Sequence, residues 1–173
     1  MSTICYELDT ESKNKLMEIF PPKYPMVKYD HITISMGGID AKLPEPAESV
    51  EVVGIADDGN GLEALIVRVN GMAVRPIDQK PWHITASFDP SKNAPAAFDI
   101  FAKSGLEKEK PYKPVTSNGL LANVLDDKGQ PKNIDNPNWK VMMFDEPIQI
   151  KTHPKVQFSV MELSKLAGNV VSK

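Results

Sequence analysis

Proline is the feature that most limits how this chain can fold. The sequence of 173 residues contains 15 prolines, and several are clustered, such as Pro21 with Pro22 and Pro44 with Pro46. Proline has no backbone N–H and a fixed φ, so a cluster of prolines interrupts both helices and sheet ladders. We therefore expect each cluster to be a connection between short elements. None of these connections is long enough to link independent domains, so residues 1–173 are predicted to form a single domain.

Most segments between the connections have the alternating apolar pattern of strands. The expected strands are 29–36, 50–56, 62–70, 82–88, 141–144, 148–151 and 156–163. Helices are expected at 10–20, 93–103 and 164–168. Residues 57–61 have the turn composition of a hairpin that joins the second and third strands. Because strands outnumber helices, we predict an α+β fold built on antiparallel sheet.

Composition and charge exclude several classes of function. The formal charge is −3 and 41% of the residues are hydrophobic, which is typical of a globular protein. Proteins that coat extended duplex nucleic acid or membrane surfaces are usually basic, so neither partner is expected. The sequence has no signal peptide and no apolar run of the roughly 20 residues that a membrane span needs. Cys5 is the single cysteine, which excludes an intramolecular disulfide and favours a cytoplasmic location, in the protein's own cell or a host cell.

One pentapeptide occurs twice. His31–Ser35, with the sequence His-Ile-Thr-Ile-Ser, recurs as His83–Ser87, with the sequence His-Ile-Thr-Ala-Ser. Both copies lie on predicted strands, where side chains alternate between two faces. The histidine, threonine and serine of each copy are therefore expected on one face, and the apolar residues on the other. One such copy is typical of a solvated antiparallel sheet, whereas two matching copies favour a functional role.

The residue types of the two copies suit acid–base chemistry on a phosphodiester. Histidine gives or takes a proton near neutral pH. Cleaving a phosphodiester requires one group that removes a proton from the attacking oxygen and another that protonates the leaving oxygen. His31 and His83 are the candidates for these roles. Thr33 and Thr85 are candidates for hydrogen bonds to the non-bridging oxygens, where negative charge accumulates.

The two copies resemble the hallmark of the two-histidine (2H) phosphoesterase superfamily, a twice-repeated histidine, apolar residue, threonine or serine, apolar residue. Residues 31–34 and 83–86 match it in full. The resemblance implies a bilobal α+β fold of antiparallel sheets with a few flanking helices, in which both motifs line a central cleft. It also implies catalysis without metal or cofactor, with His31 and His83 as general acid and base and with Thr33 and Thr85 holding the phosphate.

The resemblance also implies a class of substrate. Members of the superfamily act on cyclic phosphates and phosphodiesters of RNA ends, nucleotides and cyclic oligonucleotide messengers, so the expected partner is a nucleotide or short oligonucleotide. Residues 20–37 look closest to the RNA-repair-like branch, which is often found in phage and microbial proteins. RNA processing and destruction of a cyclic nucleotide alarm signal in anti-defence both stay open. A non-catalytic module that sequesters a nucleotide is the alternative from another class.

Further residues are candidates for substrate contact. Tyr29 lies two positions before His31 and Trp82 one before His83, so either ring is a candidate to stack on a base. Ordinary core packing is the alternative for both. Arg68 and Arg75 are the chain's two arginines and suit a phosphate. The remaining candidates are the motif serines and the cations nearest to the motifs in sequence, namely Ser35, Ser87, Lys28 and Lys80.

Two other features bear on the site. His153 precedes a proline and lacks the motif, so it is predicted to be a turn or surface histidine. A metal site that combines the three histidines with Asp30 or Asp89 has no short ligand spacing, so no metal is expected. Residues 107–138 are mostly polar and irregular, apart from 119–125, and we expect them to form a lid over the cleft.

Overall fold

The computed structural model describes residues 2–92 and 115–158. In these ranges the chain forms eight strands and two helices. In chain order they are β1 (Ser2–Leu8), α1 (Thr10–Ile19), β2 (Met26–Val27), β3 (His31–Gly37), β4 (Val50–Asp57), β5 (Leu62–Val69), β6 (His83–Phe88), α3 (Ser117–Val124), β7 (Lys140–Gln149) and β8 (Thr152–Gln157). Neither helix is long and apolar enough to cross a membrane, as judged on this described part of the chain.

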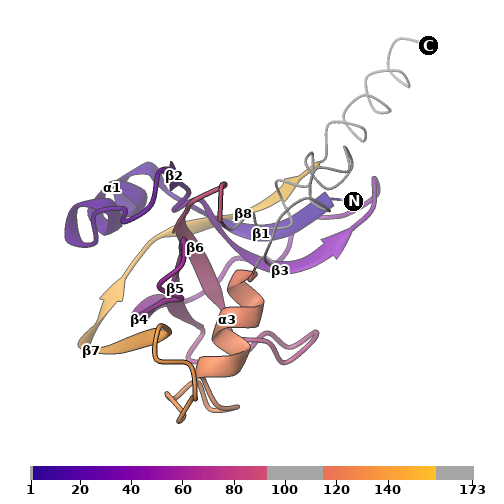
Figure 1. The fold of residues 1–173 in the computed structure, drawn as a ribbon. Helices are drawn as coiled ribbons and strands as arrows, with labels where there is room; N and C mark the ends of the chain where they lie inside the picture. Colours follow the sequence, from indigo (N-terminus) through magenta and orange to yellow (C-terminus); the bar gives the residue numbers. More distant parts are fainter. Residues whose placement is uncertain (1, 93–114, 159–173) are drawn as a thin grey trace, which may run out of the picture.

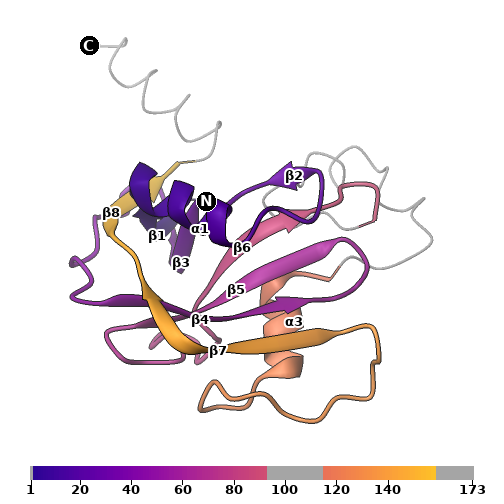
Figure 2. The ribbon, with the colours of Figure 1, turned by 90° about the vertical axis from the view of Figure 1, so that its left-hand side faces the viewer.

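All the strands pair antiparallel in one open sheet. The strand order is β7-β4-β5-β6-β3-β1-β8, and β2 pairs with β6 beside this path. The predicted α+β class with antiparallel sheet is therefore confirmed. β7 and β8 lie at opposite ends of this order, yet only Ile150 and Lys151 separate them in sequence. The sheet consequently curls so that its two ends approach each other (Figure 2).

The apolar residues of strand β5 show that the sheet is covered on both faces. Leu65, Val67 and Val69 belong to one hydrophobic cluster, and Ala64 and Ile66 belong to another. Alternation along a strand places these two sets on opposite faces. The run of apolar residues in β5 is therefore the signature of a central strand covered on both sides.

One helix covers each face of the sheet. Leu16 of α1 is fully buried in the first cluster, together with Tyr29 and Ile32. Leu120 and Leu121 of α3 are fully buried in the second cluster. The ribbon accordingly shows α1 and α3 on opposite sides of the strands (Figures 1 and 2). The protein is thus layered as helix, sheet and helix.

Strands β3 and β6 meet at a single residue pair, Ile32 with Ile84. The rest of β6 pairs with β2. Lys28 and Tyr29, which follow β2, extend this pairing by donating backbone hydrogen bonds to carbonyls of β6. Beyond Ile32, β3 leaves β6 and continues beside β1 (Figure 1). The two halves of the sheet therefore separate at the point where the two His-Ile-Thr copies begin.

Several predicted elements differ from the structure at their ends. The helix predicted at 10–20 and the strands predicted at 29–36, 50–56, 62–70 and 82–88 are confirmed with shifts of one or two residues. The strand β1 was not expected. The two short strands expected at 141–144 and 148–151 are one strand, β7, and β8 begins before the predicted 156–163. The helices predicted at 93–103 and 164–168 lie outside the described residues.

Candidate active site

The two copies of the His-Ile-Thr motif lie on neighbouring strands. β3 begins at His31 and β6 begins at His83. The strands are antiparallel, and the central isoleucines of the two copies, Ile32 and Ile84, form the one pair between them. In this register each histidine is level with the threonine of the other copy. The two motifs are therefore related by a local two-fold arrangement around the isoleucine pair.

A cavity of about 820 Å³ opens where the two strands separate. The structure brings eight of the predicted site residues together in its lining: Lys28, His31, Thr33, Ser35, Arg75, Lys80, His83 and Thr85. Residues of the loop before β6, of the N-terminus of α3, of β1 and of β8 also line the wall. Side chains from several parts of the chain that are distant in sequence thus converge on one polar space.

His31 is oriented by the residue that precedes it. The Nδ1 atom of His31 lies 2.9 Å from Oδ2 of Asp30. The hydrogen bond from His31 lowers the pKa of Asp30 to about 2, against the opposing effect of its partial burial. Asp30 is therefore an anion at neutral pH, and its hydrogen bond holds the His31 ring through Nδ1. Among the described residues none hydrogen-bonds to Nε2 of His31, which leaves this atom available to a ligand.

His83 has a different environment from His31. Its ring is buried, and its Nδ1 atom donates to the carbonyl oxygen of Pro81 at 3.0 Å. Burial lowers the pKa of His83 to about 4, with a smaller contribution from the charge of Arg75. His83 is therefore neutral at pH 7. A neutral imidazole that donates through Nδ1 keeps its lone pair on Nε2, so Nε2 of His83 is the atom that can accept a proton.

The start of helix α3 contacts the second motif. The hydroxyls of Thr85 and Ser117 lie 2.8 Å apart. Ser117 is the first residue of α3, and the preceding Thr116 caps the helix by accepting from the backbone N–H of Gly119. The positive end of the helix dipole thus lies at the wall of the cavity, where it favours a negatively charged ligand.

Arg75 is a buried cation in this cavity. It is only 5% exposed, and its guanidinium donates two hydrogen bonds to the carboxylate of Asp78. Its Nη1 atom also lies 3.4 Å from the carbonyl oxygen of Thr33, at the point where β3 has left β6. Arg75 therefore links the loop before β6 to the first motif, and Asp78 fixes the position of its charge.

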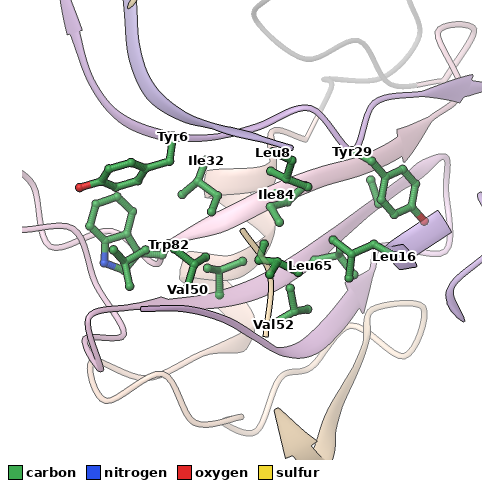
Figure 3. Packing of buried hydrophobic residues seen from close by; sticks show 14 residues of the cluster. Tyr6, Leu8, Leu16, Tyr29, Ile32, Val50, Val52, Leu65, Trp82 and Ile84 are labelled. Carbon is green, nitrogen blue, oxygen red and sulfur yellow. The ribbon is translucent and has the colours of Figure 1, made fainter. Parts of the chain in front are cut away.

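The structure places Tyr29 and Trp82 away from the cavity. Both rings are buried in the core cluster and neither lines the cavity. Tyr29 donates from its hydroxyl to the carbonyl oxygen of Phe20. It has a φ of 46°, so the backbone turns there and the shared-face argument, which assumes a continuous strand, fails. Trp82 packs against Tyr6, with ring centroids 6.2 Å apart (Figure 3).

Ser87 and Arg68 also lie away from the cavity. Ser87 is fully buried and donates to the carboxylate of Glu63. The pairing of β5 with β6 shifts by one residue between Thr85 and Ser87, and this bulge turns Ser87 to the other face. Arg68 lines a separate open cavity of about 480 Å³ near Gly71. Neither residue is placed to contact a ligand held between the histidines.

The other expectations have mixed outcomes. The half-exposed His153 lies on β8 and contacts Asp9 and Glu7, as expected for a surface residue. Within residues 2–92 and 115–158, no three His, Cys, Asp or Glu side chains gather in an arrangement that could hold a metal ion. Residues 107–114 of the expected lid lie outside the described residues. The described part, 115–138, contains helix α3, which largely coincides with the stretch 119–125 that was excepted from the irregular segment, and the leucines of α3 pack in the core.

Three residues of the site were missed as functional partners. Asp30 had been considered only as a metal ligand, although it directly precedes His31 in the sequence. Asp78 follows Arg75 by three residues, a spacing that could have suggested an ion pair. Ser117 gave no signal, because its approach to Thr85 depends entirely on the packing of α3 against the sheet.

Comparison with known proteins adds little. No family model matches the chain, and no curated protein matches it. Among solved structures, it is similar to the crystal structure of a fungal RNA kinase, with 13% sequence identity and a TM-score of 0.44. The similarity covers 92% of this chain and 46% of the kinase chain, so this chain spans about half the length of that protein. At this level the similarity carries no conclusion about activity.

Proposed function

We propose that this protein is a metal-independent phosphodiesterase that acts on nucleotides or short oligonucleotides by two-histidine acid–base catalysis. The observation that supports the proposal is the convergence of both His-Ile-Thr copies on one cavity. The resemblance to the 2H phosphoesterases rests on the same residues. In this proposal the two halves of the sheet, which separate after Ile32 and Ile84, are the two lobes that flank the cleft.

The different environments of the histidines suggest their roles. His83 is neutral at pH 7 and is assigned as the general base, which takes a proton from the attacking hydroxyl or water. His31 is assigned as the general acid, because Asp30 holds its Nδ1 and leaves its Nε2 to face the ligand. As the new phosphorus–oxygen bond forms and the old one breaks, the proton from His31 passes to the leaving oxygen. The reaction therefore ends with the two protonation states exchanged.

Three further side chains are assigned to the phosphate. Thr33 and Thr85 would donate hydrogen bonds to its non-bridging oxygens, and the N-terminus of α3 behind Thr85 adds a favourable dipole. Arg75 would supply a buried positive charge next to the first motif. Such charge-assisted hydrogen bonds are stronger in a water-poor cavity than at the surface.

The test is an activity assay with a matched control. RNA ends that carry a 2′,3′-cyclic phosphate, cyclic dinucleotides and cyclic trinucleotides are incubated with purified protein and a chelator. We expect turnover of at least one substrate, and a loss of about 10²- to 10⁴-fold in His31→Asn and His83→Asn. His153→Asn removes the third histidine, which lies outside the cavity, and should retain full activity.

The same assay separates the alternatives. Full activity in His31→Asn or His83→Asn would refute the acid–base assignment. Tight binding of a nucleotide that remains intact after long incubation would instead identify a module that sequesters its ligand. Products identified by mass spectrometry would distinguish action on RNA ends from action on cyclic oligonucleotides.

A further inference from the structure

The repeat that carries the two motifs is longer than five residues. Lys28 precedes His31 by three positions, and Lys80 precedes His83 by the same three positions. The two octapeptides are Lys-Tyr-Asp-His-Ile-Thr-Ile-Ser and Lys-Pro-Trp-His-Ile-Thr-Ala-Ser. Both lysines line the same cavity as the histidines. Each motif therefore contributes not only an imidazole and a hydroxyl but also a cation.

The antiparallel register places these two lysines at opposite ends of the motif pair. Each lies four residues before the isoleucine that joins the strands, Ile32 or Ile84. The backbone N–H of Lys28 donates to the carbonyl of Ala86, near the end of β6, whereas Lys80 precedes the start of that strand. Six residues along an extended strand separate the two positions, which corresponds to about 20 Å between the backbones. Their flexible side chains can reach inward from both ends.

The two aspartates of the cavity, Asp30 and Asp78, each have a hydrogen-bond partner other than the lysines. Asp30 accepts a hydrogen bond from His31, and Asp78 accepts two from Arg75. The charge of Lys28 also lowers the pKa of Asp30, and the charge of Lys80 lowers that of Asp78. Both effects are smaller than those of the hydrogen bonds. Both acids are thus already engaged by other cations of the site. The two lysines add positive charge on either side of the histidines.

We propose that Lys28 and Lys80 form two flanking phosphate subsites, one on each side of the scissile phosphate. The ligand is then a single-stranded oligonucleotide that presents three consecutive phosphodiesters, the middle one between the histidines. A lone nucleotide or a dinucleotide fills only the centre. The inference rests on the proposed function for the position of the middle phosphate, and it adds the length and charge pattern of the substrate.

Calorimetry with uncleaved probes tests these subsites. The probes are 2′-O-methyl-uridine oligomers without terminal phosphates, a dimer with one phosphodiester and a tetramer with three. A cyclic trinucleotide with three phosphodiesters, shown by mass spectrometry to remain intact during the titration, forms a second arm, which distinguishes a cyclic from a linear ligand. Exposed ion pairs contribute up to about fivefold in affinity each, so two of them should let the wild-type protein bind the tetramer or the cyclic trinucleotide up to about 25-fold more tightly than the dimer. Binding of the three-phosphate ligand should also depend more steeply on salt, by about 1.4 in the logarithmic slope.

Substitution of the lysines should remove this preference. In Lys28→Ala/Lys80→Ala the affinity for the tetramer should fall to that for the dimer, while Lys28→Arg/Lys80→Arg retains the preference. Lys132→Ala/Lys140→Ala removes two exposed lysines that do not line the cavity and serves as the matched control. Equal thermal unfolding of the variants shows that they are folded.

Two results would overturn the proposal. One is equal wild-type affinity for the dimer and for both three-phosphate ligands. The other is a preference for three phosphates that survives in Lys28→Ala/Lys80→Ala. Because the readout is binding of uncleaved probes, it is independent of catalysis. Lysine-dependent binding in a protein that turns over no phosphodiester would refute the proposed function and leave the two subsites standing.

Discussion

The free energy of unfolding should depend on pH through His83 in a way that can be calculated. Burial lowers the pKa of this imidazole from 6.5 to about 4. Between these values the unfolded chain binds a proton that the folded chain does not, so acid favours unfolding. The contribution is fully present above pH 6.5 and is lost as the pH falls to about 4. The difference between the two pKa values corresponds to roughly 3 kcal/mol, a large fraction of the stability of a small domain.

Urea unfolding at a series of pH values between 7 and 4 measures this effect. The comparison is with His83→Asn, which keeps a donor for the carbonyl of Pro81 but cannot be protonated. All other titrating groups are shared, so their effects cancel in the difference. We expect the wild type to lose roughly 3 kcal/mol relative to the variant over this range. NMR titration should give a midpoint near 4 for His83 and one above 6.5 for His153, whose pKa is raised by Asp9.

Parallel curves for the two proteins would refute this reasoning. They would mean that the ring of His83 takes up its proton as readily in the folded state as in water. The burial of the second motif would then be incorrect, and with it the assignment of His83 as the neutral partner.

Two further predictions concern the rate and the packing. If His83 is the general base, kcat/KM should fall on the acid side with an apparent pKa near 4, and an acid limb at 6.5 or above would contradict the assignment. Gly54→Ala should destabilise the protein by about 1–3 kcal/mol, because a Cβ there would lie 2.8 Å from the backbone oxygen of Met142. Gly71→Ala is the matched control in open space with a φ of 77°, and it should cost about 1 kcal/mol through backbone strain alone. Chemical denaturation of both variants measures the two losses, and an unchanged stability of Gly54→Ala would show that the close contact at Gly54 relaxes without cost.

The alternation of apolar residues was sufficient to predict the central strands and the repeat that they carry. It failed where the backbone departs from an ideal strand. Cys5 and Tyr6 are adjacent and both buried, so β1 has no regular alternation, and its pairing with β3 shifts by one residue between Ile4 and Cys5. The bulge before Ser87 and the left-handed backbone of Tyr29 defeated the shared-face argument in the same way.

Periodicity could not place the residues that reach the site from outside β3 and β6. Asp78 and Arg75 lie in the loop before β6, and Ser117 lies at the start of a helix after residues that the sequence indicated only as polar. Their places depend on how loops pack against the diverging strands. Sequence patterns indicate which face a strand presents, but they do not indicate which distant loop will cover it.

Strands β3 and β6 diverge at the Ile32–Ile84 pair, and each strand carries one imidazole. The distance between the two rings is therefore set by the position of this pair, and not by the motifs themselves. Moving the pair by two residues would slide one ring past the other by about 7 Å while every motif residue stayed the same. A chain of this kind can thus keep both motifs and lose its activity through a change in where the two strands pair.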